Sequence, residues 1–155
     1  VLTASDGYLL HPDLQVVLDL NAFQTSIRSG WSAHAEGRRE AARSAFLRAE
    51  QLYQGDFALA KSDPGEGEEY RRAFLQAIYW LAEDDLCCSQ AEACRARAQR
   101  ILREDPWHTG AAALLLKAYL ASGNRRAARR HYERLMKIHD SLPPEIVQIA
   151  RTYGL

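Results

Sequence analysis

The sequence predicts an all-α fold: a right-handed stack of helical hairpins, about seven helices in all, preceded by a short extended segment. From residue 19 onward, apolar residues recur at the three- and four-residue spacing of amphipathic helices. Stretches that contain Gly or Pro separate these periodic segments, and most connections are short. A set of small and large residues also repeats at a fixed interval along the chain. Together these observations predict repeated pairs of antiparallel helices.

Residues 1–18 are expected to be extended rather than helical. Asp6-Gly7 is a turn-forming pair, and the aromatic and aliphatic run Tyr8–Leu10 follows it. A few residues later, Leu14–Leu18 predicts a second short extended stretch. Because two short strands are not stable alone, we expect residues 1–18 to be the remnant of a preceding domain and its linker.

Seven helices are predicted after this segment. Their approximate ranges are 19–35, 38–54, 68–85, 90–104, 109–122, 125–140 and 144–153. Asp19 or Asn21 is a suitable N-cap for the first helix, and Gly37 follows its end. Residues 55–67 contain Pro64 and three glycines, so a loop is expected there.

Four positions define the repeat. They are occupied by Gly123, Ala128, Tyr132 and Leu135 in one unit and by Ser89, Cys94, Ala98 and Ile101 in the unit before it. Each pair differs by 34 residues, which is the period of tetratricopeptide repeats. The same internal spacing occurs in Gly37, Ala42, Phe46 and Ala49. The pattern therefore predicts three tetratricopeptide-like units.

The repeat has a packing reason. A small residue lets the second helix of a hairpin approach the first, and a larger residue four positions later fills the groove between them. Each hairpin leaves an apolar face that only its neighbour covers, so about three units are needed for stability. We predict one domain at 19–155, with repeats at about 20–54, 68–106 and 107–141 and a closing helix at 144–153.

The chain is neutral as a whole, with 20 basic and 20 acidic residues, but its charge is distributed unevenly. Residues 1–85 carry 8 basic and 14 acidic side chains, whereas residues 86–139 carry 11 basic and 4 acidic ones. A neutral chain is a poor independent binder of nucleic acid. No apolar run approaches the roughly 18 residues of a membrane span, so no membrane segment is expected.

The sequence offers no set of residues typical of catalysis, a cofactor or a metal, so we predict neither an enzyme nor a bound cofactor. Gly65-Glu66-Gly67 is acidic and lacks the Lys-Ser/Thr of a phosphate loop. The five histidines are scattered, and the three cysteines lack the second short-spaced Cys/His pair of a zinc site. We expect Cys94 and one of the adjacent pair Cys87-Cys88 to be buried small residues, with a thiol sensor as the alternative.

The predicted helix 125–140 concentrates basic residues: Arg125, Arg126, Arg129, Arg130, Arg134 and Lys137. Four of them share one stripe through steps of four and three residues, and Arg125 and Arg129 lie beside it. Two interpretations remain open. The stripe is either a solvated outer face or a surface that binds a carboxylate-rich partner or DNA phosphates. Trp107, at a predicted helix start, is a further candidate for a protein contact.

Several short motifs are similar to those of one family. Gly7-Tyr8-Leu9-Leu10 resembles the end of the wing hairpin in a winged-helix DNA-binding domain. Leu52–Phe57, Ile101–Pro106 and Gly123–Tyr132 resemble segments of the helical module that follows such a domain. In their order and spacing, these motifs resemble the bacterial transcriptional activation domain, the effector module of antibiotic-regulatory-protein-type activators. The resemblance covers essentially the whole chain.

The resemblance implies a cytoplasmic regulator. A winged-helix domain missing from this chain would read the DNA, and this module would contact another protein through self-association or through RNA polymerase or a sigma factor. It implies no membrane and no small-molecule ligand. A different class remains open, namely a free-standing tetratricopeptide scaffold or adaptor that binds a peptide or a partner protein. A winged-helix pattern upstream of Val1 would separate the two.

Overall fold

The computed structural model describes residues 2–4, 7–9, 12–53, 64–138 and 141–155, with side chains placed from Leu20 onward except for residues 64–66. The chain forms two compact units, Val1–Ala77 and Ile78–Leu155, and the division falls within one long helix. Across the described residues, no helix combines the length and the apolar character that crossing a bilayer requires.

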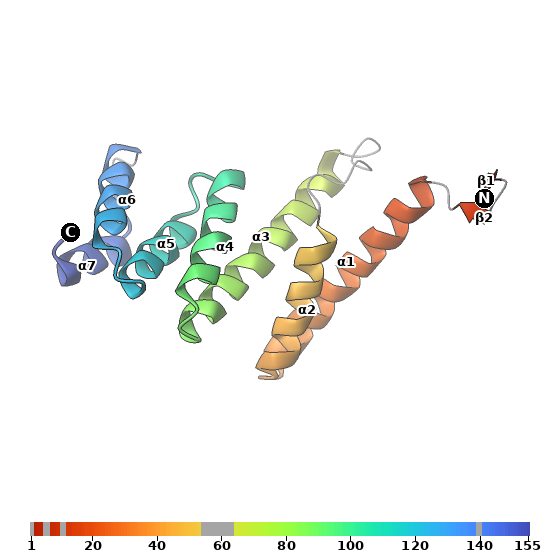
Figure 1. The fold of residues 1–155 in the computed structure, drawn as a ribbon, viewed down its shortest axis with the longest axis horizontal. Helices are drawn as coiled ribbons and strands as arrows, with labels where there is room; N and C mark the ends of the chain where they lie inside the picture. Colours follow the sequence, from red (N-terminus) through yellow and green to blue (C-terminus); the bar gives the residue numbers. More distant parts are fainter. Residues whose placement is uncertain (1, 5–6, 10–11, 54–63, 139–140) are drawn as a thin grey trace. The chain divides into compact units, whose positions relative to one another are not determined.

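Within these ranges the chain forms two short strands and seven helices (Figure 1). The strands β1 (Leu2–Ala4) and β2 (Gly7–Leu9) pair antiparallel, with Leu2 opposite Leu9. The helices are α1 (Pro12–Ala35), α2 (Arg39–Leu52), α3 (Pro64–Cys87), α4 (Ala91–Glu104), α5 (Thr109–Ala121), α6 (Arg125–Ile138) and α7 (Pro144–Tyr153). The predicted all-α fold of tetratricopeptide-like hairpins is confirmed. Asp6 of the predicted turn and Asp140 of the predicted sixth helix lie outside the described residues.

Two boundary predictions were wrong because helix begins earlier than expected. Leu14–Leu18, predicted to be extended, lies inside α1. Pro12 occupies the first helical position, where its missing N–H is not needed, and extending an existing helix is easier than nucleating one. Likewise α3 begins at Pro64, within the predicted loop 55–67, and acidic residues follow in its first turns, where the helix dipole favours them.

The first helix of each hairpin ends in the same turn. Gly37, Ser89 and Gly123, at the first repeat position, all adopt a left-handed backbone, with φ values of 71°, 61° and 73°. In each turn the N–H of this residue bonds to the carbonyl three residues back, and the next N–H bonds to the carbonyl five residues back. This is the Schellman arrangement. Ser89 has a Cβ, so its left-handed conformation is about 1–2 kcal/mol less favourable than that of a glycine.

The remaining repeat positions line the interior of the hairpins. Eight of the nine side chains at these positions are buried: Ala42, Phe46, Ala49, Cys94, Ala98, Ile101, Ala128 and Leu135. The ninth, Tyr132, is half-buried. The interval read from the sequence therefore marks the contact between the two helices of each hairpin.

Aromatic rings form the core of the first unit. Phe23 of α1, Phe46 of α2 and Phe74 of α3 are each at most 1% exposed. Tyr53, just after α2, stacks on Phe74 with a centroid separation of 3.7 Å. Gly30 lies where α1 crosses α2, and a Cβ at this position would come within 2.4 Å of the Phe46 ring. The close approach of the two helices therefore depends on the absence of a side chain at residue 30.

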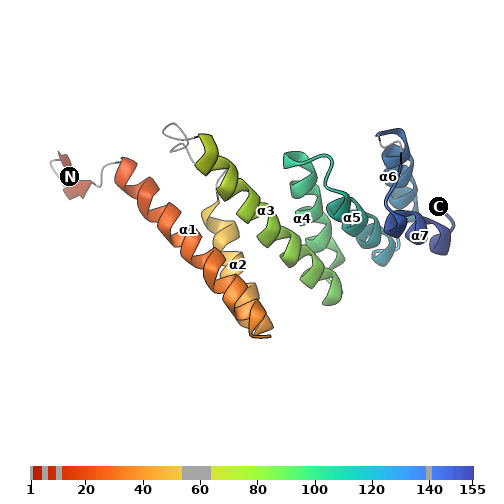
Figure 2. The same cartoon turned by 180° about the vertical axis from the view of Figure 1, so that it is seen from behind.

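Two adjoining clusters form the core of the second unit, in which α4 and α5 lie side by side and α7 packs on α5 (Figure 2). Leu102 of α4 packs against both clusters. Ile146 of α7 is 1% exposed, and Lys117 of α5 donates to Glu145 of α7 at 2.6 Å. Arg125 of α6 donates to the carbonyl of Tyr153, which ties the end of α7 to the start of α6.

The one cysteine in the core of the second unit is Cys94, as predicted. Burial raises the pKa of its thiol to about 11, and the negative charge of Asp85 adds to this shift, so the thiol stays protonated at neutral pH. Cys87 and Cys88 are both exposed, so the prediction that one of them is buried was wrong. They lie where α3 ends and the chain turns away from the core.

Candidate protein-interaction surface

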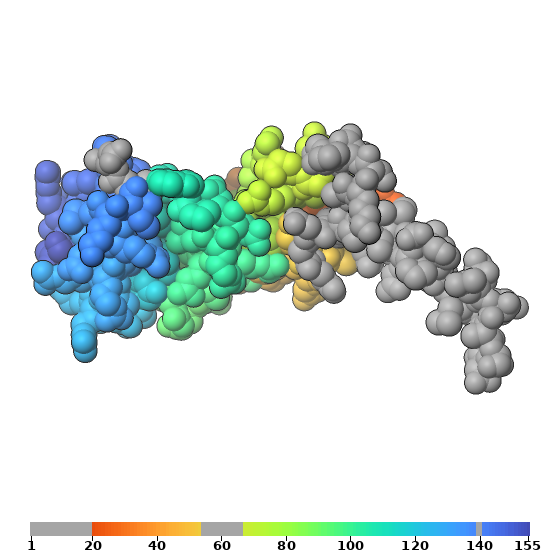
Figure 3. Space-filling model, turned by 90° about the horizontal axis from the view of Figure 1, so that it is seen from above, coloured from red at the N-terminus to blue at the C-terminus, as the bar shows by residue number. Residues whose placement is uncertain are grey.

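Helix α6 has one buried face and one strongly basic face. The side-chain oxygen of Asn124 accepts from the N–H of Ala127 at 3.1 Å and so caps the start of the helix. The buried face consists of Ala127, Ala128, His131 and Leu135. The opposite face lies on the open surface of the second unit, where α6 is blue in Figure 3.

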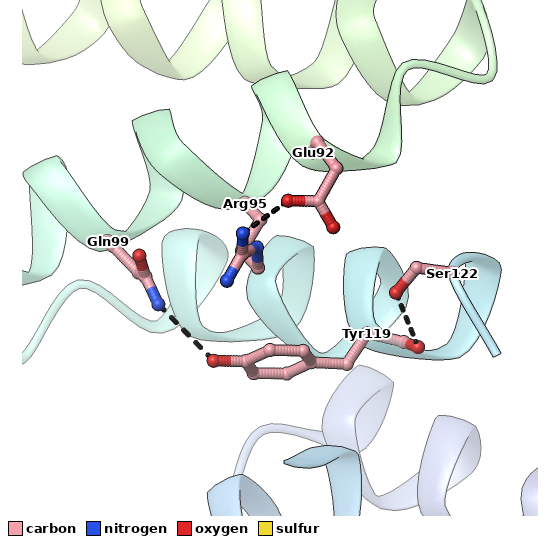
Figure 4. Close-up of polar contacts among 5 residues, drawn as sticks. All are labelled: Glu92, Arg95, Gln99, Tyr119 and Ser122. Carbon is pink, nitrogen blue, oxygen red and sulfur yellow. Dashed lines mark hydrogen bonds and ion pairs between the residues drawn. The ribbon is translucent and has the colours of Figure 1, made fainter. Parts of the chain in front are cut away.

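A small group of polar side chains lies between α4 and α5 (Figure 4). Gln99 of α4 donates to the hydroxyl of Tyr119 of α5 at 3.3 Å, and Ser122 donates to the Tyr119 carbonyl at 3.1 Å. Arg95 forms an ion pair with Glu92 one turn earlier on α4. Its Nε atom is buried and has no hydrogen-bond partner among the described residues. Of these contacts, the bond from Gln99 to Tyr119 is the one that joins the two helices.

His131 joins α6 to this group. Its Nε2 lies 3.1 Å from the carbonyl oxygen of Ala112, its Nδ1 lies 3.2 Å from a guanidinium nitrogen of Arg134, and its ring meets Tyr119 edge to face. A neutral ring with its proton on Nε2 satisfies both contacts, since it donates to Ala112 and accepts from Arg134. Burial lowers the pKa of His131; the nearby charge of Arg134 lowers it further, while the bond to Ala112 opposes the shift.

The burial of His131 makes stability depend on pH. Because the folded-state pKa of His131 is lowered, the unfolded chain binds the proton more readily, and stability falls as pH drops below the ordinary value of about 6.5. We expect the urea midpoint to fall between pH 7 and pH 5.5 by more in the natural protein than in a His131→Gln variant, whose amide still donates to Ala112. Identical pH dependence in the two proteins would contradict the assignment.

Three of the six basic side chains of α6 are held within the second unit. Arg125 donates to the Tyr153 carbonyl, and Arg129 forms an ion pair with Glu133 at 3.2 Å. Arg134, which the sequence places in the basic stripe, contacts His131. Half of the predicted basic set therefore has a structural role.

The other three, Arg126, Arg130 and Lys137, are exposed and have no hydrogen-bond or ion-pair partner among the described residues. At 100° per residue they fall within an arc of about 40° on the side of α6 opposite its buried face. At a rise of 1.5 Å per residue the row is about 16 Å long. We call these three residues the cationic row.

Exposed apolar side chains also occur in the second unit. Trp107, in the turn before α5, is 62% exposed, and Met136 and Ile138, at the end of α6, are 53% and 47% exposed. Met136 and Ile138 are two residues apart, so their side chains point about 200° apart and lie on different sides of α6.

Trp107 was predicted from the sequence as a candidate contact, whereas Met136 and Ile138 were not. The helical pattern held the signal: Met136 falls off the stripe defined by Ala128, His131 and Leu135, so it is an apolar residue that the core does not require. Single exposed apolar side chains are common on protein surfaces, so exposure alone does not mark Met136 or Ile138 as a contact.

Other parts of the described structure are weaker candidates for a functional site. No group of three or more His, Cys, Asp or Glu side chains among the placed residues is arranged to hold a metal ion. A hollow of about 720 Å³ between α1 and α2 is lined by small residues and one charged side chain, Arg48. A second, of about 410 Å³, has one cation and one anion on its walls, Arg28 and Glu69. Neither concentrates charge of one sign as α6 does.

The chain has no significant match among curated proteins or among solved structures. It does match the family model described as the bacterial transcriptional activator domain, over residues 18–141, which includes every helix from the body of α1 to the end of α6. The hairpin architecture and this match over most of its length agree. The chain therefore belongs to the bacterial transcriptional activator domain family, a family of regulatory rather than catalytic domains.

Proposed function

We propose that this domain acts by binding another protein through the outward face of α6, while a winged-helix domain outside this chain recognises DNA. The partner is a component of the transcription machinery or a second copy of the activator. Membership in an activator family supports the regulatory role. The cationic row supports the site of contact, because its side chains serve no internal partner among the described residues.

The observation that carries this proposal is the contrast between the two halves of the basic set. A cation paired within its own domain has a structural reason to be present, as Arg129 has in Glu133. The cationic row adds net positive charge to the surface without forming an ion pair among the described residues. A row of like charges raises the local potential, speeds the approach of an acidic partner and opposes a basic one.

The test is charge reversal in the full-length activator. We expect Arg126→Glu with Arg130→Glu to reduce reporter activation roughly tenfold, since each lost attraction is replaced by a repulsion of about 1 kcal/mol. Arg28→Glu with Arg72→Glu is the matched control, because it reverses two exposed cations in the first unit. Promoter binding in a gel-shift assay and the melting temperature should be the same in all three proteins.

Full activation by the α6 variant would exclude this surface as the contact. Loss of promoter binding would instead mean that α6 supports DNA recognition. A free-standing adaptor, the alternative class, would not act at a promoter. Reporter expression would then be unchanged in every variant, although the α6 variant would still lose binding to its partner protein.

A further inference from the structure

We infer that the second unit binds a small organic cation, an amine on an apolar body, in a hollow where three helices end. The hollow measures about 360 Å³, which is within the size range of small-molecule sites. None of the residues that line it belongs to α6, so the inference goes beyond the proposed function. Apolar side chains and one ammonium form its walls: Leu86, Lys117, Leu120, Ala121, Ile149 and Tyr153.

The apolar walls of the hollow are held in place by the core. Leu86 packs against one of the two core clusters of the second unit, and Leu120 and Ile149 pack against the other. These three side chains are only half-buried, and Tyr153 is 47% exposed. A ligand with an apolar body would therefore remove further apolar surface from water without rearranging the core.

The ends of α3, α5 and α7 make the hollow electrically negative. Leu86 is the last residue but one of α3, Ala121 is the last of α5, and Tyr153 is the last of α7. The final carbonyls of a helix carry the negative end of its dipole. Neither α3 nor α5 has a basic residue in its last turn to compensate this charge. Arg125 already donates to the Tyr153 carbonyl, so one of these helix ends binds a cation within the chain.

Two carboxylates lie one turn before the apolar walls. Glu83 precedes Leu86 on α3 by three residues, and Glu145 precedes Ile149 on α7 by four, so each pair shares a face of its helix. Burial of Tyr79 raises its pKa to about 12, and the negative charges of Glu83 and Glu145 add to this shift. Both carboxylates therefore act on the same region. An ammonium at this side of the hollow would face two anions and three helix ends.

Lys117 is the one charged side chain among the described residues that line the hollow, and it is already paired. Its ammonium donates to Glu145 at 2.6 Å. A ligand amine would compete with Lys117 for Glu145. A ligand carboxylate would instead have to displace Glu145 from Lys117, and the helix ends would repel it. Removal of Lys117 should therefore strengthen the binding of an amine and weaken the binding of an acid.

The probes are hexylamine, hexanoate and hexanol, which share one apolar chain and differ in the charge of the head group. Binding to the 155-residue chain is followed by the chemical-shift changes of its backbone amides as each probe is added. We expect hexylamine to bind roughly tenfold more tightly than hexanol, because each helix end adds a part of the attraction. Hexanoate should bind no more tightly than hexanol. The largest shifts should occur at the ends of α3, α5 and α7.

Four variants separate the parts of the site. Ala121→Phe fills the hollow from an exposed position and should abolish binding. Lys117→Met should tighten the binding of hexylamine several-fold, whereas Glu145→Gln should weaken it by a similar factor. Arg103→Met is the matched control, because it removes an exposed cation of α4 that does not line the hollow, and it should leave every affinity unchanged. The melting temperature of each variant shows that its fold is intact.

Tightest binding of hexanoate, lost in Lys117→Met, would overturn the inference and identify an anion site. Equal binding of the three probes, or binding of none, would also overturn it. A capped Leu-Lys dipeptide presents the same ammonium and apolar group from a protein backbone. Tighter binding of this dipeptide than of hexylamine would refute a free amine and assign the hollow to a segment of a partner protein. These variants leave α6 unchanged, so their outcome is independent of the reporter assay.

Discussion

Replacing Asp85 by alanine is expected to destabilise the second unit by about 3–5 kcal/mol, because it leaves a cation buried without its anion. Asp85 lies at the end of α3 and is fully buried, and its carboxylate forms an ion pair with Arg97 of α4, whose side chain is 14% exposed. The pair spans the first and second helices of one hairpin. Urea denaturation followed by circular dichroism measures the loss.

A second variant separates the ion pair from the volume of the side chain. Replacing both partners, with Asp85→Leu and Arg97→Met, removes the charges together and keeps apolar contacts in their place. We expect this double variant to be within about 1–2 kcal/mol of the natural protein, because well-packed apolar residues often substitute for a buried pair. A loss below about 1 kcal/mol for Asp85→Ala alone would show that water reaches the guanidinium and compensates it.

The fold was largely predictable because its determinants are local and repeated. Tight packing between two helices requires a small residue, and the turn between them favours a left-handed residue, so both recur at one interval. Ser89 is not a glycine, yet its distance of 34 residues from Gly123 correctly predicted that it occupies the same position in its turn. Local signals were misleading in Leu14–Leu18. Its β-branched residues favour a strand, but the segment lies within a helix that begins at Pro12.

The candidate site was predictable only in part. The sequence identifies six cations on one helix, but it does not show which of them are engaged. Arg125 bonds to the carbonyl of Tyr153, 28 residues away, and His131, which contacts Arg134, also lies against the carbonyl of Ala112 on α5. The exposure of Ile138 likewise reflects where the packing on α5 stops, which a single helical pattern does not encode. The structure thus reduces the basic stripe to the cationic row.

Substitutions at the contact between Gly30 and Phe46 should cause the second large loss of stability. Phe46→Ala is expected to cost about 3–5 kcal/mol, since a fully buried ring is lost. Gly30→Ala alone is expected to cost about 1–3 kcal/mol, although alanine is the better helix former, because three ring atoms lie within 2.8 Å of the new Cβ. Trp31 packs edge to face on the same ring at 4.9 Å and limits how far Phe46 can shift.

The two substitutions should therefore couple. In the Phe46→Ala background the ring is gone, so Gly30→Ala should change sign and stabilise the protein by up to about 1 kcal/mol through helix propensity and partial filling of the cavity. Ser29→Ala, an exposed change one residue earlier on α1, is the control and should be additive with Phe46→Ala. Urea midpoints of the single and double variants give the coupling energy directly. If Gly30→Ala destabilises both backgrounds equally, the close approach of α1 and α2 does not depend on residue 30, and the packing reason given for the first hairpin fails.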